Sequence, residues 1–174
     1  DKAQLTRFTG FMERLSDIAA IISILGNHDL YRRDSAKKDC WRVCSPEVIT
    51  AALADNPRIT FLQNAAHEDD KLYIYGFAPD SEYYCYDSAH GNKSSIFSPQ
   101  VEDKNILIHN FKQIPAVKIH NLPNNKIKLF LCHSPVYLGD KAIKPYLTDF
   151  DAYLSGHMHN GVVPPALNDF WQSD

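Results

Sequence analysis

The sequence predicts an α/β layered fold, and two patterns carry that prediction. Helix-like and strand-like segments alternate along the 174 residues, which is typical of layered α/β domains. Three short apolar runs also end in turns that carry histidine, and ligands of such folds bind outside the carboxyl ends of the strands. We therefore expect a single domain over residues 1–174 with one crevice at its strand ends.

The first quarter of the chain predicts a helix, a strand and a second helix. Residues 2–17 space their apolar side chains as a helix does. Residues 18–25 form a continuous apolar run, as in a strand that is covered on both faces. Residues 31–44 are polar and basic, and an exposed excursion is expected there. Ser45-Pro46-Glu47 then provides an N-cap, a first-turn proline and a first-turn acid, which opens a helix to about residue 54.

Short apolar runs predict the remaining strands near residues 58–63, 71–77, 126–132 and 149–155. Residues 64–70 are polar and are expected to form a turn. Residues 101–113 have apolar residues on one side and are expected to form a helix.

The composition argues against two classes of protein. The formal net charge is −3 at pH 7, whereas nucleic-acid-binding domains usually carry a strong basic excess, so no nucleic-acid partner is expected. No apolar run approaches 18 residues, so no transmembrane segment is expected in this chain. A phosphorylated substrate is compatible with the charge because bound metal cations supply positive charge locally.

The first histidine-bearing turn is Gly26-Asn27-His28-Asp29. Glycine allows a sharp turn where a side chain would clash. The amide oxygen of Asn27 is a hard donor that suits a divalent ion, and His28 offers a ligand or a general acid. The alternative is an ordinary loop with a helix cap.

The other two turns supply His133 and the pair His157 and His159. Taken alone, each is also consistent with an ordinary hydrogen-bonded loop residue. Residues i and i+2 face opposite sides of a regular strand, but at a strand end that opens into a turn they can reach two neighbouring ions. Imidazole nitrogen is the commonest metal ligand, so the set as a whole predicts a metal-dependent enzyme.

The ordered set of Gly26–Asp29, His133 and Gly156–His159 resembles the calcineurin-like metallophosphoesterases, over about residues 1–163. Members of that family carry, in order, Asp-x-His, Gly-Asp, Gly-Asn-His-Asp/Glu, a single His and Gly-His-x-His. The resemblance implies a four-layer αββα sandwich and a phosphoester hydrolase with two divalent metal ions. It implies a phosphorylated small molecule or a phosphodiester as the substrate.

The resemblance also implies a role for each matching residue. Asn27, His133 and His157 would bind one metal ion, and His159 would bind the other. His28 would stabilise the transition state and protonate the leaving oxygen. A hydroxide bridging the two ions would attack phosphorus in line, since ions about 3.5–4 Å apart clamp the attacking and leaving oxygens. Mn, Fe and Zn all suit such a donor set, which leaves the metal open. Asp29 is expected either to support this centre or to hold the loop.

Two family motifs, Asp-x-His and Gly-Asp, do not occur upstream of Gly26. The fold is therefore expected to lack its first strand or strands, and the domain its N-terminal part. The 174 residues are expected to bind metal poorly and to hydrolyse little, the parent chain being the enzyme. Residues 156–165 resemble a bacterial branch of the family that acts near the cell envelope. Localisation stays open between the cytoplasm and attachment to the membrane through the missing segment.

Two other functions remain as alternatives. The same sandwich can serve as a catalytically inactive, protein-binding scaffold, although such a scaffold has no chemical reason to keep five ligand-type groups at strand ends. A structural zinc site of His133, His157 and His159 is disfavoured, because closed structural sites mostly use thiolates with short paired spacings. A basic cluster of Arg32, Arg33, Lys37 and Lys38 follows Gly26–Asp29, and it is expected to be a solvated loop or to attract a phosphorylated substrate.

Overall fold

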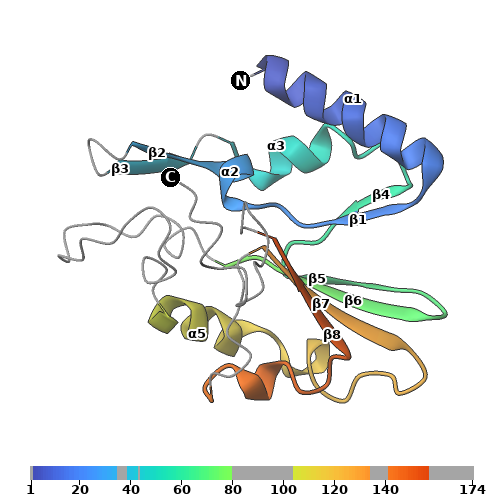
Figure 1. Ribbon diagram of the computed structural model, residues 1–174, viewed down its shortest axis with the longest axis vertical. Helices are drawn as coiled ribbons and strands as arrows, with labels where there is room; N and C mark the ends of the chain where they lie inside the picture. The colour runs from blue at the N-terminus through green and yellow to red at the C-terminus, as the bar shows by residue number, and fades with distance from the viewer. Residues whose placement is uncertain (1, 35–38, 43, 80–103, 134–140, 157–174) are drawn as a thin grey trace, which may run out of the picture.

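The fold has four layers, which Figure 1 shows from one side. The computed structural model describes residues 2–34, 39–42, 44–79, 104–133 and 141–156. One outer layer holds the helices α1 (Lys2–Ile18) and α3 (Pro46–Ala51), and the sheet beneath it pairs β1 (Ile21–Ser23) with β4 (Ile59–Phe61). The second sheet has the order β5 (Ala65–Glu68), β6 (Leu72–Phe77), β7 (Ile127–Cys132), β8 (Ala152–Ser155). The other outer layer holds α5 (Lys104–Gln113) with the 3₁₀ turns η3 (Ala116–Lys118) and η4 (Lys144–Tyr146).

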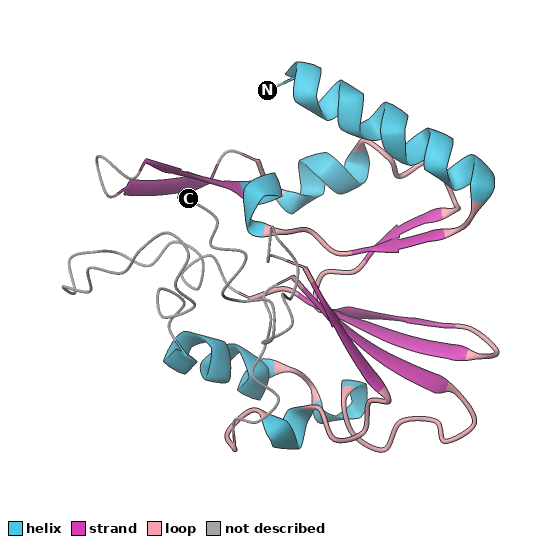
Figure 2. Cartoon of the chain, viewed as in Figure 1, coloured by secondary structure: helices cyan, strands magenta, loops and turns pink. Residues whose placement is uncertain are grey.

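This arrangement confirms the predicted α/β class and its αββα order of layers (Figure 2). Strands β1 and β4 are parallel, and β6, β7 and β8 are parallel to one another. Only β5 runs antiparallel to its neighbour in the larger sheet. The carboxyl ends of β6, β7 and β8 therefore lie at one edge of that sheet.

Close side-chain contacts hold the layers together. The rings of Phe8 on α1 and Phe61 on β4 lie 6.4 Å apart. The two sheets meet at Gly76, where an added Cβ would overlap Leu62 and lie 2.9 Å from Ile24 Cγ2. A larger residue at Gly76 would therefore push the sheets apart.

The main core lies between the larger sheet and the helices α5, η3 and η4. Alternate residues of β6 face it, and they stack aromatic rings onto Phe111 of α5 and Phe130 of β7. Its buried members are Tyr73, Tyr75, Phe77, Phe111, Ile114, Ile119, Leu122, Phe130, Cys132, Ile143 and Leu147. This core holds β6 and β7 in place, and His133 follows directly after the carboxyl end of β7.

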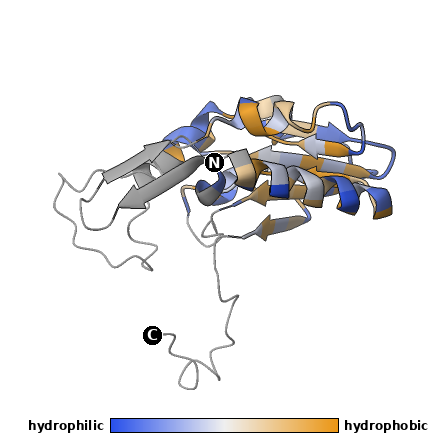
Figure 3. Cartoon of the chain, turned by 90° about the horizontal axis from the view of Figure 1, so that it is seen from above, coloured by the Kyte–Doolittle hydropathy of each residue, from blue (hydrophilic) through white to orange (hydrophobic). Residues whose placement is uncertain are grey.

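The smaller core lies on the other side of the molecule, around Leu25 and Ile49. Parts of α1 are not covered: Phe11 is 54% exposed and Ile18 is 82% exposed. Figure 3 accordingly shows hydrophobic and hydrophilic residues mixed on the helical layer that is visible from above. Among the described residues, no helix is both long and apolar enough to cross a membrane.

Residues 31–44 contain regular structure that the sequence did not predict. A one-turn helix, α2 (Asn27–Leu30), leads directly into the hairpin of β2 (Tyr31–Asp34) and β3 (Asp39–Arg42). The expected excursion is therefore an antiparallel hairpin. Its strands are polar and pair locally, so they lack the apolar alternation by which a half-buried strand is recognised.

Two further boundaries differ from prediction. Residues 65–68 form β5 where a polar turn was expected, because they pair antiparallel with β6 across a turn at residues 69–71, where Asp69 accepts the N–H groups of Lys71 and Leu72. Asn64, just before β5, takes a left-handed conformation (φ 53°). The Asn64 side chain accepts a hydrogen bond from the Ala78 N–H and donates one to the Ala78 carbonyl. Strand β1 begins at Ile21 rather than at Ile18, which is the last residue of α1.

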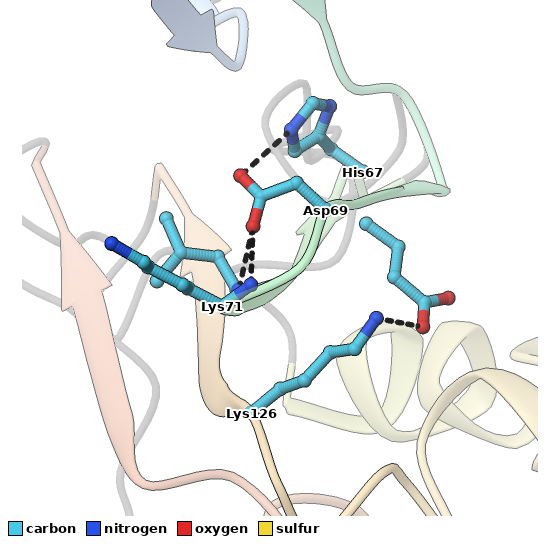
Figure 4. Close-up of polar contacts among 6 residues, drawn as sticks. His67, Asp69, Lys71 and Lys126 are labelled. Carbon is cyan, nitrogen blue, oxygen red and sulfur yellow. Dashed lines mark hydrogen bonds and ion pairs between the residues drawn. The ribbon is translucent and has the colours of Figure 1, made fainter.

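The polar contacts at the amino ends of β6 and β7 are structural (Figure 4). Asp69 accepts backbone N–H hydrogen bonds from Lys71 at 2.7 Å and Leu72 at 2.8 Å, and these bonds lower the pKa of its carboxyl. Lys126 binds Glu68 at 2.7 Å. This cluster lies at the opposite end of the strands from the carboxyl edge, so it has no part in a site at that edge.

Candidate metal centre

The Gly26–Asp29 turn follows β1 and is fixed on both sides. Leu25, which precedes it, is buried in the smaller core. The backbone N–H of Gly26 donates to Asp29 Oδ2 at 2.8 Å, and the Asp29 N–H donates to the Gly26 carbonyl at 3.2 Å. Asp29 therefore holds the loop, which is one of the two roles expected for it.

His133 comes to this turn from the carboxyl end of β7. Its Nε2 lies 2.9 Å from Asn27 Oδ1, although 106 positions separate the two residues in sequence. Both residues are half-buried. The preceding residue, Cys132, is fully buried in the main core, so the backbone that carries His133 is anchored.

Two glycines leave room for the His133 ring. A Cβ on Gly26 would lie 2.7 to 2.9 Å from three ring atoms of His133, closer than real Cβ contacts come. A Cβ on Gly156, at the end of β8, would lie 3.4 Å from His133 Nδ1. The Gly156 N–H also donates to the His133 carbonyl at 3.1 Å. The ends of β1, β7 and β8 therefore meet at one histidine, as the strand-end argument predicted.

The structure explains the glycine at position 26 differently from the sequence. Its backbone is not in the left-handed region, so the turn itself does not require glycine. The close approach of the imidazole requires it. The contacts of Gly26 and Gly156 with His133 were missed by sequence reasoning, because they depend on a packing distance between segments far apart in the chain.

The donor pair fits a divalent metal ion. Two donors held at right angles by bonds of about 2.1 Å lie about 3.0 Å apart. The Asn27 Oδ1 to His133 Nε2 distance of 2.9 Å matches that spacing. Without an ion the same two atoms form a hydrogen bond in which Nε2 is the donor, so Nε2 would have to lose that proton to bind an ion.

The other predicted site residues are only partly placed. His28 lies in α2 beside Asn27, and its side chain is outside the described part of the chain. His157 and His159 lie outside the described residues, although Gly156 immediately before them contacts His133. Within the described residues, no group of three or more His, Cys, Asp and Glu side chains could hold an ion. His67, His109 and His120, which match no family motif, lie away from this turn on other elements or loops.

A comparison with protein-family models places this chain in a family. The family model described as calcineurin-like phosphoesterase matches residues 3–161. The match covers most of the chain and includes all three histidine-bearing turns, so the protein belongs to the calcineurin-like phosphoesterase family. Members of this family generally bind divalent metals. No match was found among curated proteins or among solved structures.

Proposed function

We propose that this protein is a metal-dependent phosphoester hydrolase with a dinuclear centre. The observation that carries the proposal is the 2.9 Å approach of Asn27 Oδ1 and His133 Nε2 inside a glycine-lined turn. These groups come from different strands and have the spacing of neighbouring metal ligands. Membership of the phosphoesterase family supports the same chemistry.

Asn27, His133 and His157 would hold one ion, and His159 would contribute to the other. Divalent ions bound there would lower the pKa of water and neutralise phosphoryl oxygens. The metal would be Mn, Fe or Zn. The substrate would be a phosphorylated small molecule or a phosphodiester.

His28 would act on the leaving group rather than on the metal. It follows Asn27 directly on α2, so it lies next to a ligand position. An unperturbed imidazole has a pKa of about 6.5, which suits a proton donor near neutral pH. The role of His28 would be to donate its proton to the departing oxygen.

The test compares two histidine variants in the natural full-length protein. Metal content is measured together with hydrolysis of p-nitrophenyl phosphate and bis(p-nitrophenyl) phosphate. His28→Ala should lower turnover by about a hundredfold or more and leave bound metal nearly unchanged. His133→Ala should lower both. If the two variants behave alike, the separation of acid from ligand is wrong.

A second comparison tests the part played by the upstream motifs. The 174-residue chain has no Asp-x-His or Gly-Asp motif upstream of Gly26, and without their carboxylates we expect weak metal binding and little hydrolysis. Rapid turnover by the 174-residue chain would contradict this expectation. A full-length protein that binds metal but hydrolyses neither chromogenic substrate would favour the protein-binding scaffold.

A further inference from the structure

The side chain of Asp29 closes the turn that carries Asn27. Its Oδ2 accepts the Gly26 N–H at 2.8 Å, while its own N–H donates to the Gly26 carbonyl at 3.2 Å. Helix α2 begins at Asn27, so Gly26 immediately precedes the helix and Asp29 is its third residue. From that third position an acidic side chain can reach back to the N–H in front of a helix. Both backbone polar groups of Gly26 are therefore bonded to one residue.

The Gly26 N–H needs this acceptor. Gly26 is buried, and a buried N–H without an acceptor costs about as much free energy as a lost hydrogen bond. Helix α2 has only four residues, and a helix of one turn gains little stability from its own backbone bonds. The position of Asn27, the first residue of this helix, therefore depends on the bond that the Asp29 side chain makes.

The position of Gly26 also governs the approach of His133. A Cβ on Gly26 would lie 2.7 Å from His133 Cε1, so the ring packs directly on the Gly26 backbone. Asn27, the next residue, places its Oδ1 2.9 Å from His133 Nε2. A displacement of Gly26 would therefore disturb the ring contact and the spacing of the two donor atoms together.

We propose that Asp29 is a positioning residue of the metal centre. Through the Gly26 N–H, its carboxylate holds Asn27 Oδ1 at the distance from His133 Nε2 that suits a bound ion. The bond that holds the loop thus also supports the centre. The proposal rests on the metal-binding part of the function proposed above and adds a residue that acts through its hydrogen bond, without contacting the ion.

The first test is calorimetric titration of the full-length protein with Zn²⁺. Asp29→Ala removes the acceptor and should weaken Zn²⁺ binding about tenfold, as the loss of a group that orients a metal ligand does. Asp29→Asn keeps an oxygen that can accept the Gly26 N–H but loses the charge, and it should weaken binding less than about threefold. Rescue by asparagine would show that the hydrogen bond matters rather than the charge.

Asp69→Ala is the matched control. Asp69 likewise accepts backbone N–H groups, those of Lys71 and Leu72, at 2.7 and 2.8 Å. It does so at the opposite end of the strands, away from Asn27 and His133. Thermal unfolding should therefore show a lower Tm for both alanine variants, whereas only Asp29→Ala should lose affinity for Zn²⁺. This difference separates positioning of the ligand from general stability.

Amide hydrogen exchange in the metal-free protein measures the bond itself. The Gly26 amide hydrogen should exchange with solvent faster in Asp29→Ala than in the unmodified protein, and asparagine should restore most of its protection. The displacement should also appear as a shift of the His133 ring signals in NMR spectra. These readouts need neither metal nor substrate.

Four results would overturn the inference. Unchanged Zn²⁺ affinity in Asp29→Ala would mean that Asn27 is positioned without this bond. Equal losses in Asp29→Ala and Asp29→Asn would mean that the charge matters instead. An equal loss in Asp69→Ala would mean that the affinity follows general stability, and no Zn²⁺ binding by the unmodified protein would leave no centre to position. A full-length protein that binds Zn²⁺ but hydrolyses no phosphoester would refute the proposed hydrolase, and the titrations would still decide the role of Asp29.

Discussion

Gly26→Ala should weaken metal binding at the candidate metal centre while leaving the rest of the fold intact. The added methyl group would lie 2.7 Å from His133 Cε1, where an ordinary contact begins at 3.4 Å. The ring must therefore retreat by about 0.7 Å, the difference between these two distances. A retreat directed away from Asn27 would stretch the 2.9 Å contact to about 3.6 Å, beyond hydrogen-bonding range.

Two quantities should change in this variant. Forcing an extra methyl group into a packed position costs about 1–3 kcal/mol of unfolding free energy, which lowers Tm by about 3–10 °C for a chain of this size. Displacing a ligand from its position should weaken metal binding about tenfold to a hundredfold. Thermal unfolding measures the first effect, and titration of the full-length protein with Mn²⁺ or Zn²⁺ measures the second. Nitrogen-15 NMR signals of the His133 imidazole report its displacement directly.

Two glycine controls make the prediction specific. Gly10→Ala places its methyl group in the interior of α1, 3.6 Å from an Arg14 nitrogen, and it should stabilise the helix by about 0.5–1 kcal/mol. Gly156→Ala reaches His133 Nδ1 only at 3.4 Å, so its effect should be smaller than that of Gly26→Ala. If Gly26→Ala binds metal as tightly as the unmodified protein and leaves the His133 signals in place, the reasoning about the close approach is refuted.

Three further substitutions test the fold around the site. Gly76→Ala would overlap Leu62 between the sheets, and denaturant titration should show a loss of about 3 kcal/mol; a loss below about 1 kcal/mol would contradict the packing. Tyr75 has a fully buried hydroxyl that finds no hydrogen-bond partner among the residues that the structure describes, and burial raises the pKa of Tyr75 to about 12. Because only the unfolded chain ionises this group from about pH 10, the native state loses stability between about pH 10 and 12; Tyr75→Phe should reduce that loss and be nearly neutral at pH 7, as alkaline unfolding curves would show. Asp151 accepts a hydrogen bond from the Lys128 N–H at 2.7 Å, which lowers the pKa of its carboxyl below 3.8, so its stabilisation is present above that value and is lost as the pH falls through the lowered pKa. Asp151→Ala should therefore lower Tm at pH 7 and have little effect at pH 2; an equal effect at both would exclude the charged hydrogen bond.

The strongly patterned elements could be predicted from the sequence. The helical spacing of residues 2–17 corresponds to α1, and the apolar runs near residues 71–77 and 126–132 contain β6 and β7. Hydrophobic periodicity does not predict a strand that is polar or that forms only because it pairs with a neighbouring strand. Residues 65–68 become a strand because the turn at residues 69–71 aligns them with β6, and local periodicity does not reveal such an alignment.

The convergence at the site could be predicted for a topological reason. Parallel strands bring the turns at their carboxyl ends to one edge of the fold. From this, Asn27 and His133 can be predicted to lie close together although they are far apart in the sequence. Their exact approach could not be predicted. It depends on the absence of a Cβ at Gly26, and the effect of that absence depends on the packing of two distant segments. The ligand roles of His28, His157 and His159 stay predictions.

His133 is held in place before any metal binds. The fully buried Cys132 anchors its backbone, the Gly156 N–H binds its carbonyl, and Gly26 packs against its ring. A ligand fixed in this way loses little conformational freedom when an ion arrives, so little of the binding free energy is spent on ordering it. Weak metal binding by the 174-residue chain would therefore point to too few ligands around the ion rather than to a mobile His133.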